Sequence, residues 1–180
     1  GEGTVRMWGR GRAGGNGRVR GRGGVIDNGG GPRTIEGAEG AALLRGTWRN
    51  AVINGTGTLE ATGRAGGVES VAVNGAVEMN NNAVTAVTGG LTVNGALRLV
   101  DQSSTPTRLQ FDQTQTLNGT GVIEFASGNA AINSNVLEAI NGHTLTIESG
   151  LTVQGPAGST GGGAVGGANG TVRLLAPVLP

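Results

Sequence analysis

The chain has 180 residues, of which 38 are glycine and 2% are aromatic, and its formal net charge is +1. So few large apolar residues exclude a thick globular core of Leu, Phe and Trp, but they allow a thin core of stacked Val, Ile, Leu and Ala. Cysteine is absent, which excludes disulfides and thiolate metal sites, and all 13 basic residues are arginine, which excludes a Schiff-base lysine and a P-loop.

Targeting features are equally sparse in the sequence. No stretch approaches the roughly 20 apolar residues that a membrane helix needs. No signal peptide is visible, and the chain starts with Gly, so we expect a processed product or a fragment of a longer protein.

Charge is distributed unevenly along the chain. Residues 1–49 contain nine Arg against four acids, whereas residues 50–180 contain four Arg against eight acids. This asymmetry predicts a first segment at 1–49. We expect regular repeats at 50–154, and the low-complexity composition after them predicts a Gly-rich segment with a final strand at 155–180.

The amino-terminal segment is rich in Arg-Gly pairs and is open to three interpretations. It can form the first layers of the repeat with arginines facing outward, it can be a flexible basic arm, or it can bind a polyanion. Gly9 to Gly14 formally match GxGxxG, but no helix can follow, which argues against a dinucleotide site. The residues that would bind a polyanion are Arg10, Arg12, Arg18, Arg20 and Arg22.

From residue 50 onward an Asn-Gly pair recurs. Successive pairs are separated by roughly 20–24 residues, and the last interval is somewhat longer. The pairs begin at Asn54, Asn74, Asn94, Asn118, Asn141 and Asn169.

Alternating apolar and polar residues precede and follow most of these pairs. Leu91-Thr92-Val93 and Leu97-Arg98-Leu99 flank one of them, and this alternation predicts strands with one buried face. Asn-Gly supplies the positive φ of a tight bend. Each unit is therefore a strand, a bend, a second strand and a looser connection.

A fixed period of this length is typical of a solenoid. We predict an all-β fold, a single-stranded parallel β-helix with coils of about 20–24 residues. A sandwich or barrel is the alternative, although its turns would recur every ~8–12 residues. Leucine-rich repeats share the period but would lead into helices, for which the sequence shows almost no periodicity.

Stacked coils would bring the bend asparagines into a column. We expect their side-chain amides to form a structural hydrogen-bonded ladder. Its members would be Asn54, Asn74, Asn94, Asn118 and Asn141.

Residues capable of catalysis are few. His143 is the only histidine, which excludes a cluster of His ligands. Asp101 and Asp112 flank the longest segment outside the repeat and would supply the carboxylates of a polysaccharide-cleaving enzyme, if the chain were one. The sequence predicts no catalytic residue, no metal site and no cofactor.

The runs NGTGTLE, LTVNGALRL and LTIESGLTVQG resemble the right-handed β-helix regions of bacterial autotransporters and filamentous-haemagglutinin-like surface proteins. The resemblance covers roughly residues 45–175 and implies a secreted or surface-displayed structural or adhesive role. The prediction is an extracellular solenoid segment of a bacterial surface protein or fibre that stacks end to end. The alternative is a carbohydrate- or polyanion-binding module that uses the arginine-rich face.

Overall fold

The computed structural model describes eleven parts of the chain, and the statements below concern these parts. They are residues 24–27, 33–37, 42–44, 46–55, 59–61, 64–79, 83–101, 106–127, 135–155, 163–166 and 169–179. All regular structure within them is β-strand, so the fold class is all-β.

The strands form two sheets. The first has eleven strands: β1 (Gly24–Asp27), β2 (Arg33–Gly37), β4 (Gly46–Gly55), β6 (Arg64–Val73), β8 (Val84–Val93), β10 (Arg108–Phe111), β11 (Gln115–Asn118), β13 (Asn135–Ala139), β14 (Thr144–Ile147), β16 (Gly163–Val165) and β17 (Thr171–Leu174). The second has seven: β3 (Ala42–Leu44), β5 (Leu59–Ala61), β7 (Ala76–Met79), β9 (Ala96–Asp101), β12 (Val122–Ser127), β15 (Thr152–Gln154) and β18 (Val178–Leu179).

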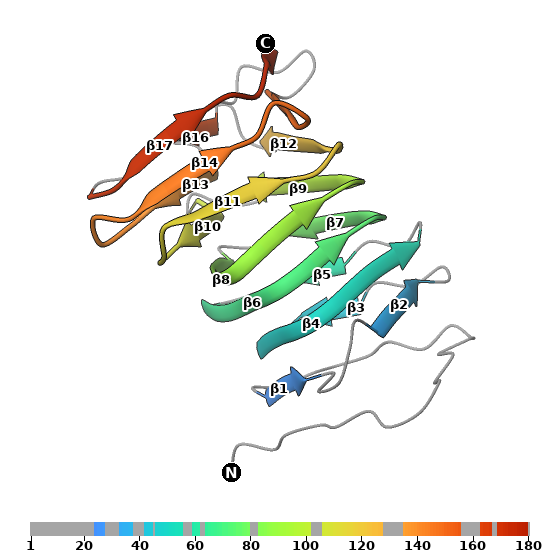
Figure 1. Ribbon diagram of the computed structural model, residues 1–180. Helices are drawn as coiled ribbons and strands as arrows, with labels where there is room; N and C mark the ends of the chain where they lie inside the picture. Colours follow the sequence, from blue (N-terminus) through green and yellow to red (C-terminus); the bar gives the residue numbers. More distant parts are fainter. Residues whose placement is uncertain are drawn as a thin grey trace.

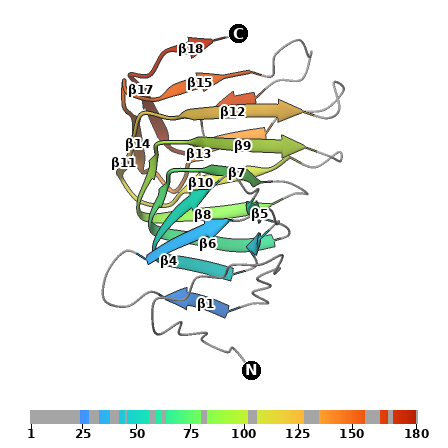
Figure 2. The ribbon, with the colours of Figure 1, turned by 90° about the vertical axis from the view of Figure 1, so that its right-hand side faces the viewer.

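The chain passes repeatedly from the first sheet to the second. We call one such passage a layer: β4 with β5, β6 with β7 and β8 with β9 are three of them. Strands of these layers pair in parallel with strands of the layers above and below. The two parallel sheets face each other and nearly close into a solenoid-like stack, with β1 near one end and β17 and β18 at the other (Figures 1 and 2).

The core runs along the inside of this stack. In β8 buried and partly exposed residues alternate, as expected when every second side chain points between the sheets. One register column passes through all seven strands of the second sheet, because its members are partners in successive layers, and its side chains from Val77 to Val153 are buried between the sheets. It contains Ala42, Leu59, Val77, Leu97, Ile123, Val153 and Val178.

The members of this column are sealed from water in the middle of the stack. Val77, Leu97, Ile123 and Val153 are at most 5% exposed. Each layer therefore covers the apolar side chains of the next, and burial of a Val or Leu side chain stabilises the fold by roughly 1.5–3 kcal/mol.

Layer length departs from the prediction in the upper half of the stack. Val71 pairs with Leu91, as the predicted period requires. Leu91 then pairs with Leu117, and Leu117 pairs with Ile147, so that each of these layers takes up more residues than the predicted coil. The predicted length is too short here. Arg108 of β10 pairs with Val136 of β13, so much of the excess precedes the first-sheet strand. The division of that strand around a bend such as Asp112–Thr114 adds the rest.

The boundaries drawn from composition have a simple relation to the strands. The boundary between residues 49 and 50 lies inside β4, and β1, β2 and β3 of the predicted first segment join the same two sheets. The boundary at residue 155 follows directly after β15, and β16–β18 form one more layer beyond it.

Candidate functional site

The side chains of three bend asparagines are joined in a ladder. Asn74 Nδ2 donates to Asn54 Oδ1 at 2.7 Å, and Asn94 Nδ2 donates to Asn74 Oδ1 at 2.9 Å. The backbone holds these residues in step, because the amides of Asn74 and Asn94 donate to the carbonyls of Ile53 and Val73 at 2.8 and 2.7 Å. Each side-chain bond is exposed to solvent, so the ladder reinforces the stacking of three layers and forms no pocket.

Asn118 and Asn141 do not continue this ladder. Asn118 pairs in register with Thr92, whose hydroxyl donates to Asn118 Oδ1 at 2.7 Å. Asn141 Nδ2 donates to Asp112 Oδ1 at 2.6 Å. The expectation of a five-membered column is wrong at these two positions, because the longer upper layers bring a threonine and an aspartate, and not the preceding asparagine, next to them.

The glycine after the bend asparagine is needed for close stacking more often than for a left-handed backbone. A Cβ atom at Gly95 would lie 2.0 Å from the carbonyl oxygen of Gly75. Gly75 and Gly95 are not among the described glycines with positive φ, whereas Gly119 and Gly142 have φ of 128° and 77°. The predicted positive φ is therefore correct at Gly119 and Gly142 and wrong at Gly75 and Gly95, and at Gly95 the neighbouring backbone approaches too closely for any side chain.

Charged side chains on the outer faces pair across layers. Arg98 lies between two carboxylates of the second sheet: its Nη1 is 3.2 Å from Glu78 Oε2, and its Nε is 3.1 Å from Glu124 Oε2. On the first sheet Arg49 Nε is 2.6 Å from Glu69 Oε2. These pairs neutralise charge within the wall of the stack.

Glu138 is the one charged residue that is buried among the described residues, with 5% exposure. Its Oε1 accepts hydrogen bonds from Arg108 Nη1 at 3.0 Å and from Gln110 Nε2 at 2.8 Å. Both partners lie on β10, the strand next to its own β13. The bonds compensate the loss of hydration, so the residue locks two layers together.

A second buried polar residue, Asn135, fills a corner between the sheets. It is 0% exposed, and its Nδ2 donates to the carbonyls of Leu99 and Ala126 at 2.7 and 3.2 Å. Its Oδ1 accepts from the amide of Thr107 at 3.4 Å. The sequence carries one sign of such a role, a polar residue directly before the apolar run of β13, but this sign does not distinguish Asn135 from the other asparagines of the loops.

The described structure brings Asp112 and His143, two residues considered for catalysis in the sequence, near each other. Asp112 Oδ1 is 4.0 Å from His143 Nε2, and the two side chains are 44% and 39% exposed. Asp112 is also bound by Asn141, and the side chain of Asp101 lies outside the described residues. The described residues contain no group of three His, Cys, Asp or Glu side chains that could hold a metal ion.

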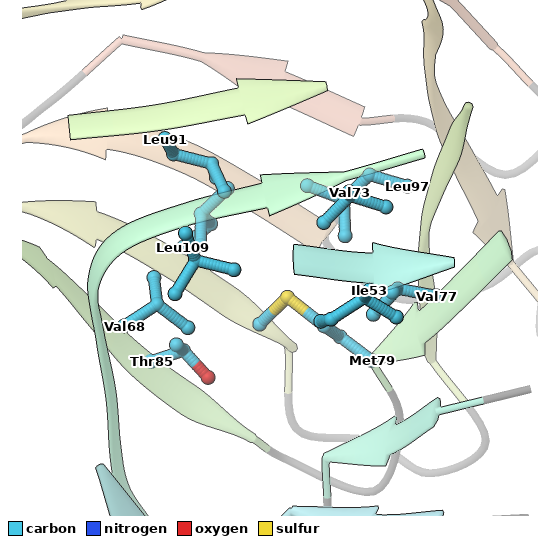
Figure 3. Close-up of a pocket in the computed structure, with 10 residues that line it drawn as sticks. Ile53, Val68, Val73, Val77, Met79, Thr85, Leu91, Leu97 and Leu109 are labelled. Atoms are coloured by element: carbon cyan, nitrogen blue, oxygen red, sulfur yellow. The ribbon is translucent and has the colours of Figure 1, made fainter. Parts of the chain in front are cut away.

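The interior contains a small void of about 30 Å³ between the layers (Figure 3). Its lining is aliphatic apart from Met79 and Thr85. A void of this size and lining offers too few polar partners to an ordered water or a polar ligand. It is a packing defect of the core, lined by Ile53, Val68, Val71, Val73, Val77, Met79, Thr85, Leu91, Leu97 and Leu109.

The predicted polyanion-binding residues Arg10, Arg12, Arg18, Arg20 and Arg22 lie outside the described residues. Within the described part of the chain, no helix is long and apolar enough to cross a membrane. Comparisons with protein-family models, with curated proteins and with solved structures find no match to this chain.

Proposed function

We propose that the chain is a structural or adhesive segment of an extracellular bacterial surface protein or fibre, built as a single-stranded parallel β-helix. The observation that carries this proposal is the continuous inward column from Val77 to Val153, in which each residue pairs in register with the next layer. Such a stack has one physical property that follows directly from its construction, which is stiffness along its axis.

Stiffness arises because the layers are bonded to one another by many groups at once. In β12 every residue from Val122 to Ser127 is in register with β9. Pulling two layers apart exposes the apolar side chains between them and breaks the backbone hydrogen bonds of the paired strands at the same time. Outer charge pairs such as Arg98 with Glu78 add links across the same boundaries.

A surface location is supported by two features of the sequence. The chain contains no cysteine, so its stability does not depend on the redox state of its surroundings. Its repeats resemble the β-helix regions of bacterial autotransporters and filamentous-haemagglutinin-like proteins, which act outside the cell.

Single-molecule force spectroscopy tests the mechanical part of this proposal. The full chain is placed between reference domains of known unfolding force, so that the load is applied across the layers. We expect a discrete force peak and the release of most of the described length in a few cooperative steps. Extension without a resolvable peak would contradict a mechanical role.

Antibody labelling tests the location. Antibodies raised against the folded chain should label intact source cells as strongly as permeabilised ones. Labelling that needs permeabilisation would place the protein inside the cell and would contradict the proposal.

The second candidate function is binding of a carbohydrate or polyanion by the amino-terminal arginines. The observation that favours it is that Arg49, Arg98 and Arg108 in the described walls are already paired with glutamates. The unbalanced positive charge therefore falls on residues 1–49, which contain nine Arg and four acids.

Retention on immobilised heparin at increasing salt tests this second function. A variant with Gln at positions 10, 12, 18, 20 and 22 should elute at much lower salt. Each arginine that contacts a sulfate group releases counterions on binding, so the loss of these contacts weakens the affinity for heparin. Arg173→Gln is the matched control, since Arg173 is exposed and makes no ion pair with the described residues. Equal elution of the five-site variant and the parent would exclude this role for the five arginines.

A further inference from the structure

The last described layer of the stack is bonded on one side only. Within the described chain, β16, β17 and β18 each pair with one strand only, namely β13, β14 and β15. The three strands lie together at the end marked C (Figures 1 and 2). The exposed large hydrophobic residues of the described structure all belong to this last layer: Leu174, Leu175, Val178 and Leu179.

Two of these side chains occupy core positions. Leu174 is in register with Ile147, and Val178 is in register with Val153. The residues underneath are 0% and 1% exposed, whereas Leu174 and Val178 are 39% and 60% exposed. Since paired residues of parallel strands point to the same face, Leu174 and Val178 are inward residues that no further described layer covers.

The backbone of the last layer is also prepared for another strand. The amide of Thr171 donates to the carbonyl of His143, the residue directly before β14. The amide of Leu175 donates to the carbonyl of Ile147 in β14. Because alternate residues of a strand direct their N–H and C=O groups to opposite edges, those of Val172 and Leu174 point away from β14.

The same holds for β18. The carbonyls of Pro177 and Leu179 accept hydrogen bonds from the amides of Val153 and Gly155 in the layer below. The N–H and C=O groups of Val178, between these two, therefore point to the outer edge.

The opposite end of the stack has the matching arrangement of strands. β1 and β2 lie at the edge of the first sheet and β3 at the edge of the second, just as β16 and β17 lie in the first sheet and β18 in the second. All of them run parallel to their neighbours. The register column that ends at Val178 begins at Ala42 in β3.

We propose that the last layer of one copy docks on the first described layer of a second copy, with β17 alongside β2 and β18 alongside β3. This head-to-tail contact continues both sheets and covers Leu174 and Val178 in the way that each layer covers the one below. The contact is heterologous and does not close, so it generates a filament. The inference rests on the proposed structural function and specifies the partner as the same chain.

Cysteine cross-linking tests the arrangement, since the parent chain contains no cysteine. Neighbouring register partners in a sheet lie about 4.8 Å apart, within the Cα separation that a disulfide spans. Ala42→Cys and Val178→Cys chains, mixed and mildly oxidised, should form a disulfide between the two different chains. The double variant should form a ladder of higher oligomers, because its two cysteines lie at opposite ends of one stack.

The other occupants of the edge give different results. A disulfide dimer of Val178→Cys chains alone, with none to Ala42→Cys, would show a tail-to-tail contact and overturn the head-to-tail proposal. No cross-link in any mixture would show that copies of this chain do not cover the edge. Thr146→Cys, on the outer face of β14, is the control for random collision and should not react with Ala42→Cys.

A second variant tests the edge without cysteine. Val178→Pro removes the N–H that points outward but leaves both hydrogen bonds from the layer below, so the monomer should keep its circular dichroism spectrum and melting temperature. We expect self-association, measured by sedimentation, to weaken about tenfold. Unchanged association of this folded variant would overturn the proposal.

The matched control alters the outward residues of the same layer. Leu179 lies in register above Gln154, and Leu175 directly follows the register pair of Leu174 with Ile147, so Leu175→Gln with Leu179→Gln leaves the two inward positions in place. Self-association of this variant should stay within about twofold of the parent. A monomeric chain that still gives discrete force peaks would sustain the proposed function and overturn only this inference.

Discussion

The amide nitrogen of the Asn135 side chain donates a 2.7 Å hydrogen bond to the carbonyl of Leu99, inside the core where Asn135 is 0% exposed. This contact joins the start of β13 to β9 of the second sheet. One side chain thereby satisfies backbone groups at a corner where strands of the two sheets meet.

Asn135→Leu should destabilise the protein by about 2–4 kcal/mol, because the carbonyls of Leu99 and Ala126 and the amide of Thr107 lose their partner in a dry environment. Urea unfolding followed by circular dichroism measures this loss. Asn118→Leu is the matched control at an exposed bend and should cost less than about 1 kcal/mol. Equal losses in the two variants would refute the structural role of Asn135.

The asparagine ladder predicts a graded series. Asn74 donates to Asn54 and accepts from Asn94, so Asn74→Ala removes two side-chain hydrogen bonds. We expect a loss of about 1–2 kcal/mol, and about half of that for Asn54→Ala or Asn94→Ala, which remove one bond each. Thermal unfolding of the three variants provides the comparison. Equal losses in the three variants would mean that the hydrogen bonds between the asparagine side chains do not contribute to the stability of the fold.

Substitution of two bend glycines by alanine should destabilise the fold for different reasons. Gly95→Ala places a Cβ atom 2.0 Å from the Gly75 carbonyl oxygen and should cost about 3 kcal/mol or more. Gly142→Ala meets nothing within 4 Å but keeps a φ of 77°, and it should cost about 1–2 kcal/mol. Unfolding free energies in urea distinguish the two. A larger loss at Gly142 than at Gly95 would show that backbone conformation, and not close stacking, decides the bend.

Arg98 predicts a small, salt-dependent contribution. Arg98→Met leaves Glu78 and Glu124 without their shared cation, and since Arg98 is 42% exposed the expected loss is about 0.5–1 kcal/mol at low salt. At about 1 M NaCl the Debye length falls to about 3 Å, and most of the difference should disappear. Arg173→Met, which breaks no ion pair of the described structure, is the control. A loss at Arg98 that persists in high salt would assign its effect to packing of the side chain instead of charge.

The stacking of the three layers that carry Asn54, Asn74 and Asn94 could be predicted from the sequence. The even spacing of the first Asn-Gly pairs places Asn54, Asn74 and Asn94 in one column, and the alternation from Leu91 to Val93 assigns the inward face. Both signals are local and are repeated without change, so the pattern alone is sufficient there.

The upper half could not be predicted in the same way. Asn118 follows the period in sequence, yet it lies above Thr92, because the layer that carries it divides into β10 and β11 and takes additional residues. The spacing along the chain includes these additional residues, but it does not show in which strand, bend or connection they lie. The pairing of Arg108 and Gln110 with the buried Glu138 likewise depends on which strands become neighbours.

The sequence by itself determined the all-β class and the inward and outward faces, because alternation along a strand is a property of neighbouring residues. Only the tertiary structure decided the register of the upper layers, the burial of Asn135 and the uncovered core positions Leu174 and Val178. The physical reason is that the exposure of a side chain depends on the layer stacked against it. That layer is formed by a distant part of the chain, as when Ile147 stacks on Leu117.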